Sequence, residues 1–532
     1  MNFNYFTAVA SAFLLSIVPG ASAALYNQVI HTSHGPVQGY PAFNSTPAGD
    51  LSHWKDITVW KGIPFAATTS GENRFRAPQP ASPWTKTLNA KSFGHVCPSA
   101  TSGNNAYTID EDCLNLNIWS AANSTNAKLR VVMWSYPAGS TGADALFDGA
   151  GMADQGVVYV NYNYRTGSFG WLASPELSKE FAQESGSKAS GNWGLLDQIA
   201  ALKWIHTNIA AFGGDPDHIT VMGQSAGSAA SQHLLHSPLT KGLIKGAIIQ
   251  SGVRYPQDPL CSSLAENYLT LDAAEKQGTK YMASLNVSTL AQMRKLPMKD
   301  LETSLATFGS NSAWSFTATL DHYAIPDTYY NTLVKGLAHD VPVLTGNTKD
   351  ESGATYGLNI SMATYLRNLN STYSGHWVQK FLDLYPAHDS KTASGAYNSQ
   401  FTDRSNVGTW LWARLWATAR TSPVYNYFWD HAPPSQNQGA AHESEINYVL
   451  NNLYATDKAW TQKDYAIARK MNGYWVNFIK TGDPNGEGLV QWHPANATQS
   501  AHHVGNGWGS IPVASEAKVS LFKSWFATLK KY

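Results

Sequence analysis

Apolar runs and helical repeats alternate along the middle of the chain. Runs typical of buried strands occupy residues 130–136, 157–161, 219–222, 246–250, 341–346 and 424–429. The apolar positions of residues 195–205 recur at helical spacing, and a second helix-like stretch reaches about His236. Residues 213–216 (GGDP) are a strong turn signal before the third strand. Strands that alternate with helices over short connections predict a mostly parallel β-sheet with helices on both faces.

Residues 1–23 have the pattern of a secretory signal peptide. An apolar run at 8–18 is followed by Pro19-Gly20 and the small-residue segment 21–23, which predicts cleavage after Ala23. No Lys or Arg precedes the run, and a buried first helix is the alternative interpretation. No later stretch approaches the roughly 18–20 apolar residues of a membrane span. We therefore expect a secreted, extracellular protein without a stable membrane anchor.

Composition narrows the range of partners. Charged residues are 14% of the chain and hydrophobic residues 43%, and 37 Lys and Arg balance 37 Asp and Glu. This neutral balance argues against nucleic acid or an anionic membrane surface as a partner. The sequence contains no linker, repeat or charge block, so we expect residues 24–532 to form a single catalytic domain with long insertions. The oligomeric state stays open.

Asparagine sequons add a prediction of glycosylation. Six Asn-x-Ser/Thr triplets lack proline at the middle position, and a secreted protein would expose some of them to glycosylation. The candidates are Asn44, Asn123, Asn286, Asn359, Asn370 and Asn496.

One short motif carries the candidate chemistry. Residues 223–227 (GQSAG) are the only G-x-S-x-G of the chain, and they lie between a predicted strand and a predicted helix. A nucleophilic serine needs such a sharp turn so that its hydroxyl projects above the sheet, and the helix N-terminus favours negative charge there. Ser225 is therefore the candidate nucleophile. The alternative is a glycine-rich turn with an incidental serine.

These residues belong to a wider resemblance. The chain resembles the type-B carboxylesterase/lipase family nearly from end to end, which implies the α/β-hydrolase fold and a serine ester hydrolase. The matching segments are 62–65 (GIPF), 74–75 (RF), 111–117 (EDCLNLN), 163–165 (NYR), 191–198 (GNWGLLDQ), 208–227 (NIAAFGGDPDHITVMGQSAG) and 250–252 (QSG).

The resemblance also implies a disulfide between Cys97 and Cys113. In the chain-entropy interpretation, closing a loop of this length stabilises the fold by about 3 kcal/mol. Cys261 is then left over, and we expect a small buried thiol there in preference to an intermolecular bridge or a reactive site.

Candidate acid and base follow Ser225 in the order that α/β-hydrolases use. The resemblance places the acid at Glu351, although the residues alone do not separate it from Asp350. It places the base at His442, where Glu443 replaces the usual following glycine. Such a triad hydrolyses an ester through an acyl-enzyme and requires no metal or organic cofactor.

The predicted oxyanion loop is unusual for the family. Pro137, Ala138 and Gly139 stand where three glycines are common. The resemblance implies that the amides of Ala138, Gly139 and Ala226 are the donors. Pro137 has no N–H but occupies the position that does not donate.

The sequence gives only a broad substrate class, a soluble and moderately apolar carboxylic ester. The segment between Cys97 and Cys113 is short for a lipase lid and contains one aromatic residue, Tyr107. Gln224 removes a negative charge that is often found beside the nucleophile, which disfavours a cationic substrate. Residues 314–316 (WSF) are a candidate pocket wall, although core packing is the commoner role of such aromatics.

Two alternative functions use the same fold. An acyltransferase or biosynthetic esterase would use the same triad, and a non-catalytic binding relative would lack one of its members. A dinucleotide site is excluded because residues 149–151 (GAG) lack the third glycine of that motif. A zinc protease is excluded because no histidine follows His442-Glu443 at the required spacing.

Overall fold

The computed structural model describes residues 24–49, 51–98, 107–264, 267–303, 314, 316–351 and 360–532. The expected signal segment, residues 1–23, lies outside the described residues, as does the sequon at Asn359. Within these ranges, no helix is both long and apolar enough to cross a bilayer.

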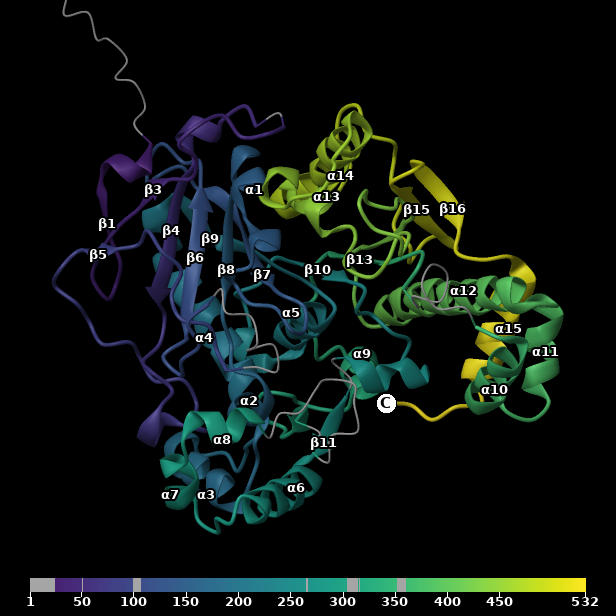
Figure 1. Ribbon diagram of the computed structural model, residues 1–532, viewed down its shortest axis with the longest axis horizontal. Helices are drawn as coiled ribbons and strands as arrows, with labels where there is room; N and C mark the ends of the chain where they lie inside the picture. The colour runs from purple at the N-terminus through teal and green to yellow at the C-terminus, as the bar shows by residue number, and fades with distance from the viewer. Residues whose placement is uncertain are drawn as a thin grey trace, which may run out of the picture.

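An eleven-stranded sheet runs through the molecule (Figure 1). Its strand order is β16-β15-β14-β13-β10-β9-β7-β8-β6-β4-β3, and neighbours from β15 to β8 are parallel. Both ends of the sheet are antiparallel. The bounds are β3 (Tyr40–Pro41), β4 (Thr58–Pro64), β6 (Asn115–Ser120), β7 (Leu129–Ser135), β8 (Val157–Tyr162), β9 (Gly214–Gln224), β10 (Gly246–Gln250), β13 (Val343–Thr348), β14 (Val424–Trp429), β15 (Ser500–Val504) and β16 (Gly509–Pro512). The predicted mostly parallel sheet is confirmed.

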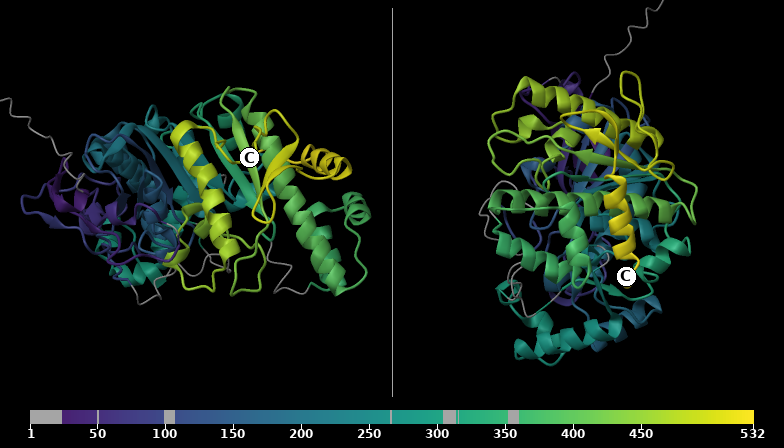
Figure 2. Two further views of the ribbon diagram at one scale, coloured as in Figure 1. Left: turned by 90° about the horizontal axis from the view of Figure 1, so that it is seen from above. Right: turned by 90° about the vertical axis from the view of Figure 1, so that its right-hand side faces the viewer.

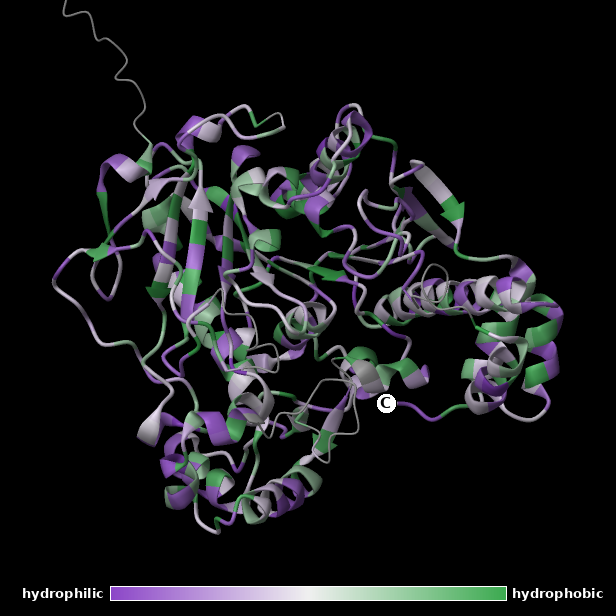
Figure 3. Cartoon of the chain, in the orientation of Figure 1, coloured by the Kyte–Doolittle hydropathy of each residue, from purple (hydrophilic) through white to green (hydrophobic). Residues whose placement is uncertain are grey.

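Helices cover both faces because the central strands have no polar face. Strands β8, β10 and β13 are buried along their whole length. On one face Tyr427 of β14 packs on Trp475 of α14 (Gln462–Thr481), with ring centroids 5.2 Å apart. Successive side chains of a strand point to opposite faces. Phe428 therefore faces the other way, as does Asn347 beside it on β13, which donates a hydrogen bond to Thr409 of α12 (Ser390–Trp416). Figure 2 shows α12 and α14 as long rods beside the sheet, and hydrophobic residues recur along the strands in Figure 3.

One local prediction is wrong. The expected turn at residues 213–216 is confined to Gly213, whose φ of 80° ends the preceding helical turn. Strand β9 already begins at Gly214, and an irregularity in its pairing with β7 between Leu129 and Val131 accommodates the extra residues.

Smaller hydrophobic cores lie beside the main one. One is formed largely by α10 (Met362–Tyr373), α11 (Trp377–Leu384) and α15 (Glu516–Phe526) against α12. Another involves α6 (Leu271–Ser284), where Tyr281 contacts Trp314 and Phe316 edge-on, with centroids 5.5 and 4.9 Å apart. The two aromatics considered as a pocket wall thus have a packing role.

Candidate active site

Ser225 occupies a sharp turn between β9 and α5 (Ala226–His236). Its φ of 55° and ψ of −121° are strained values for a residue with a side chain, and its N–H donates to Gln250 O at 3.0 Å. The flanking glycines make this turn possible. A Cβ on Gly223 would lie 2.1 Å from Gly227 O, and one on Gly227 would lie 1.9 Å from Ser135 O.

Glu351 and His442 meet beside this turn. Glu351 comes shortly after β13, and its Oε1 accepts from Thr348 N at 3.0 Å. Its Oε2 lies 2.5 Å from His442 Nδ1. The carboxyl side chain is 3% exposed, whereas the imidazole is 36% exposed. Burial opposes the charged form of each partner. The attraction between them overcomes it, raising the pKa of His442 to about 9 and lowering that of Glu351 to about 2.

Asp350, the rival candidate, is used differently. Its Oδ2 accepts from Ala440 N at 2.8 Å, and its Oδ1 accepts from Asn398 Nδ2 at 2.9 Å. Its own N–H donates to Ala440 O at 2.9 Å. Asp350 therefore ties the acid loop to the loop that carries His442, while Glu351 contacts the imidazole.

Gln224 lies against the candidate base. Its Nε2 is 3.3 Å from His442 Nε2 and 3.4 Å from Nδ1. Within the described residues no hydrogen bond joins Ser225 Oγ to His442. Contacts of this kind are often long without substrate and shorten in the Michaelis complex.

The oxyanion loop turns next to the nucleophile. Ser140 N donates to Pro137 O at 3.3 Å, and Gly139 has a φ of 81°, which together describe a type II turn with glycine at its third position. Ala138 and Gly139 are exposed. Their N–H groups, like that of Ala226, donate to no acceptor in the described part of the chain. The three candidate donors are therefore free to bind a ligand oxygen.

Comparison with known proteins identifies the family. The sequence profile of the carboxylesterase family matches residues 26–506. The chain belongs to the carboxylesterase family. It is a carboxylic-ester hydrolase with the α/β-hydrolase fold.

Individual relatives agree with this assignment. The carboxylesterase is 32% identical to the fumonisin B1 esterase of Sphingopyxis macrogoltabida, over 91% of this chain and 88% of that one. It is 30% identical to the para-nitrobenzyl esterase of Bacillus subtilis, over 88% and 92% of the two chains. A solved structure of PNB esterase superimposes with a TM-score of 0.74 at 27% identity, covering 93% of this chain and 99% of the other.

A further acid of the carboxylesterase lies near the candidate base, His442. Glu445 is fully buried, and its Oε1 accepts from Gln250 Nε2 at 3.0 Å and from Tyr427 OH at 3.3 Å. Burial raises its pKa to about 7. Sequence reasoning did not find Glu445. The available signal was a second glutamate three residues after His442.

The residue after the base is also unusual. Glu443 has a φ of 71°, a region that favours glycine, and burial raises the pKa of its carboxyl. The next two residues point inward. Ser444 Oγ accepts a hydrogen bond from Trp429 Nε1 at 2.8 Å, and Glu445 accepts one from Gln250 Nε2. The carboxylate of Glu443 has no hydrogen-bond or ion-pair partner in the described ranges.

The cysteines of the carboxylesterase follow the pairing that the resemblance implies. Cys97 and Cys113 form a disulfide with a sequence separation of 16, and Cys261 is buried and takes no part in a disulfide. Its Sγ donates to Tyr255 O at 3.2 Å. Over the described residues no group of three or more His, Cys, Asp or Glu side chains is arranged to hold a metal ion.

Proposed function

We propose that this carboxylesterase is a serine hydrolase that works through an acyl-enzyme, with Ser225 as nucleophile, His442 as general base and acid, and Glu351 as the group that orients the imidazole. The bond of 2.5 Å between Glu351 Oε2 and His442 Nδ1, beside the strained turn of Ser225, carries the proposal. It leaves Nε2 as the nitrogen that faces substrate.

The reaction follows from these positions. His442 Nε2 takes the Ser225 proton as Oγ attacks the ester carbonyl, and the resulting imidazolium is stabilised by the ionised Glu351. The same nitrogen then protonates the leaving alcohol, so that the C–O bond breaks and an acyl-serine remains. A water molecule, deprotonated by His442, attacks the acyl carbon and releases the carboxylic acid and Ser225.

Charge develops on the carbonyl oxygen in both tetrahedral intermediates. The free N–H groups of Ala138, Gly139 and Ala226 are the donors in this proposal, and the helix that begins at Ala226 adds its N-terminal dipole. Pro137 and the glycine at position 139 fix the turn, so the donors are held before substrate arrives.

The substrate class is a soluble, moderately apolar carboxylic ester. A neutral side chain, Gln224, lies against His442, which gives a cationic alcohol no fixed counter-charge from that position. The disulfide closes a loop with a sequence separation of only 16, which is short for a lid that opens at a lipid surface. Two relatives, a fumonisin B1 esterase and a para-nitrobenzyl esterase, are also esterases.

Secretion and glycosylation complete the proposal. Asn44, Asn123, Asn286 and Asn370 are exposed, and Asn496 is partly exposed. Expression of the full chain in a eukaryotic secreting host is expected to release a protein that begins at Ala24. Treatment with a peptide N-glycosidase should then lower its mass. An intracellular product that retains residues 1–23 contradicts this part of the proposal.

Ser225→Ala tests the core of the proposal. The purified enzyme is expected to hydrolyse a short-chain p-nitrophenyl ester, and the variant should lose at least about 10⁴-fold in kcat. A matched control is Ser231→Ala on the same helix, whose Oγ only bonds Gly227 O at 3.1 Å. An arylphosphonate should label the wild type and Ser231→Ala, but not Ser225→Ala. Full activity of Ser225→Ala would refute the assignment.

A further inference from the structure

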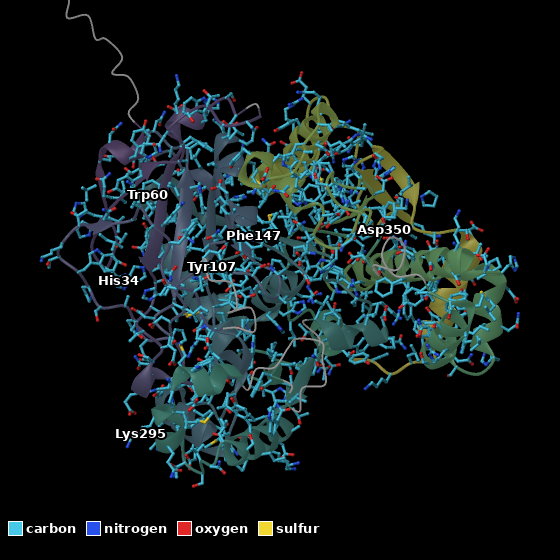
Figure 4. The ribbon with its side chains drawn as sticks, in the orientation of Figure 1. His34, Trp60, Tyr107, Phe147, Lys295 and Asp350 are labelled. Atoms are coloured by element: carbon cyan, nitrogen blue, oxygen red, sulfur yellow. A yellow bond between two sulfur atoms is a disulfide. The ribbon has the colours of Figure 1, made fainter. Side chains whose placement is uncertain are left out.

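The loop closed by the disulfide contacts the oxyanion loop through a side-chain hydrogen bond. We call the described residues next to the disulfide, 97–98 and 107–113, the disulfide loop and residues 136–144 the oxyanion loop. Tyr107 OH donates to Asp144 Oδ1 at 2.6 Å. Tyr107 is labelled in Figure 4, as is Phe147, which follows the oxyanion loop. Thirty-seven positions separate the two partners, so the contact joins distant parts of the chain.

Asp144 is also hydrogen-bonded to the backbone of the oxyanion loop. Its second carboxylate oxygen, Oδ2, accepts from Thr141 N at 2.9 Å, and its own N–H donates to Thr141 O at 3.2 Å. Thr141 immediately follows the type II turn of residues 137–140. The carboxylate of Asp144 therefore holds the chain at the point where it leaves the turn that presents Ala138 and Gly139.

The chemistry of the pair makes this a firm contact. Burial and the neighbouring Asp144 raise the pKa of Tyr107, so the phenol keeps its proton and donates it to a charged acceptor. The disulfide loop is in turn anchored close to both ends of its described parts. Cys97 is bonded to Cys113, and Val96 forms a β-bridge with Ile109, two residues after Tyr107.

We propose that Tyr107 is a positioning residue for catalysis, whose hydroxyl fixes Asp144 and thereby the oxyanion turn relative to Ser225. The disulfide loop acts on this account as a brace for the oxyanion hole. The inference rests on the proposed function, because the turn matters only if its amides bind the carbonyl oxygen of the acyl-transfer intermediates.

The brace is one of several supports, which limits its effect. Tyr136 stacks on Tyr164 with ring centroids 4.8 Å apart, and Gly142 N donates to Asn163 Oδ1 at 2.9 Å. These contacts keep the oxyanion loop folded without Tyr107. Loss of the hydroxyl is therefore expected to loosen the donors without unfolding the loop, which costs more in the transition state than in substrate binding.

Tyr107→Phe tests the proposal because it removes only the hydroxyl. For a short-chain p-nitrophenyl ester we expect kcat to fall about tenfold to thirtyfold with KM changed less than twofold. The affinity for a trifluoromethyl ketone, which mimics the tetrahedral intermediate, should fall by the same factor. Asp144→Asn, which leaves one carbonyl oxygen for the donors Tyr107 OH and Thr141 N, should lower kcat at least as much. The matched control is Tyr26→Phe, whose hydroxyl bonds Lys55 O at 3.0 Å in an exposed position.

A double substitution tests the role of the disulfide. Cys97→Ser with Cys113→Ser should lower kcat in the wild-type background and lower it much less in Tyr107→Phe, because the brace is already broken. The proposal is overturned if Tyr107→Phe keeps kcat and inhibitor affinity within twofold of wild type. It is also overturned if kcat and KM change only in step with a loss of melting temperature. If the wild type hydrolyses no ester, the proposed function fails instead.

Discussion

Glu351 and Asp350 are adjacent carboxylates with different proposed roles. Substituting them one at a time distinguishes the residue needed for catalysis from the residue that anchors the loop. Glu351→Gln keeps the shape of the side chain but leaves no charge beside the imidazolium that forms during acylation. In serine hydrolases the matching acid-to-amide substitution costs about 10⁴-fold in kcat, which corresponds to about 5.4 kcal/mol at 1.36 kcal/mol per tenfold. We expect a fall of about 10³- to 10⁴-fold in kcat here, with the enzyme still folded.

Asp350→Asn should lower the stability of the fold and have a much smaller effect on kcat. The carboxylate accepts from Ala440 N and Asn398 Nδ2, and an amide has only one oxygen for these two donors. One buried donor then faces an NH₂ group, which costs about 1–3 kcal/mol of folding free energy. The melting temperature should fall by several degrees, whereas kcat should fall far less than in Glu351→Gln.

The assay is kcat and KM for a short-chain p-nitrophenyl ester at pH 9, with thermal melts of both variants in the same buffer. The two variants act as controls for each other, because each removes one negative charge from neighbouring positions. A loss of 10³-fold or more in Asp350→Asn, together with an active Glu351→Gln, would show that the acid has been assigned to the wrong residue.

Three further predictions concern His442, Glu445 and Glu443. The base must be neutral to act, and Glu351, against the opposing effect of burial, raises its pKa to about 9. A pH profile should therefore show kcat/KM rising from pH 6.5 to 9. The stability from the raised pKa is complete below about pH 6.5 and lost as the pH approaches 9, so melting temperatures should fall over the same interval. Glu445→Gln removes a buried acid whose folded pKa of about 7 exceeds its unfolded value, so above pH 7 the variant should melt higher than wild type. The same substitution should move the rise of kcat/KM to lower pH, because the charge of Glu445 raises the pKa of His442; an unmoved profile contradicts the coupling. Glu443→Gly should increase the free energy of unfolding by about 1 kcal/mol by relieving the φ of 71°, as measured by denaturant titration; a destabilised variant would show that the side chain supports the fold.

Sequence patterns predicted the fold correctly and singled out the candidate site residues for physical reasons. Buried strands have continuous apolar runs, and β10 and β14 begin and end where those runs do. Ser225 was found because a strained strand–helix turn requires glycines on both sides. His442 and Glu351 came from the family resemblance and the order along the chain.

Other features depended on tertiary contacts with no local signature. Asp350 and Glu351 are adjacent carboxylates, and only the pairing of Asp350 with Ala440 decides which of them faces His442. The bond of Tyr107 to Asp144 joins loops whose sequences have no shared pattern. The inward direction of Glu445 likewise depends on its hydrogen bonds with Gln250 of β10 and Tyr427 of β14.

The order of the triad along the chain has a consequence for biosynthesis. Protein synthesis delivers the Ser225 turn first, Glu351 after 351 − 225 = 126 further residues, and His442 after 442 − 225 = 217. Strand β14, which precedes the loop that carries His442, is also paired with β15. Strand β15 ends only at Val504. The nascent chain therefore carries the proposed nucleophile without the proposed base while these 217 residues are added. On the proposed mechanism, the nascent chain cannot hydrolyse esters before β15 has been synthesised and paired with β14.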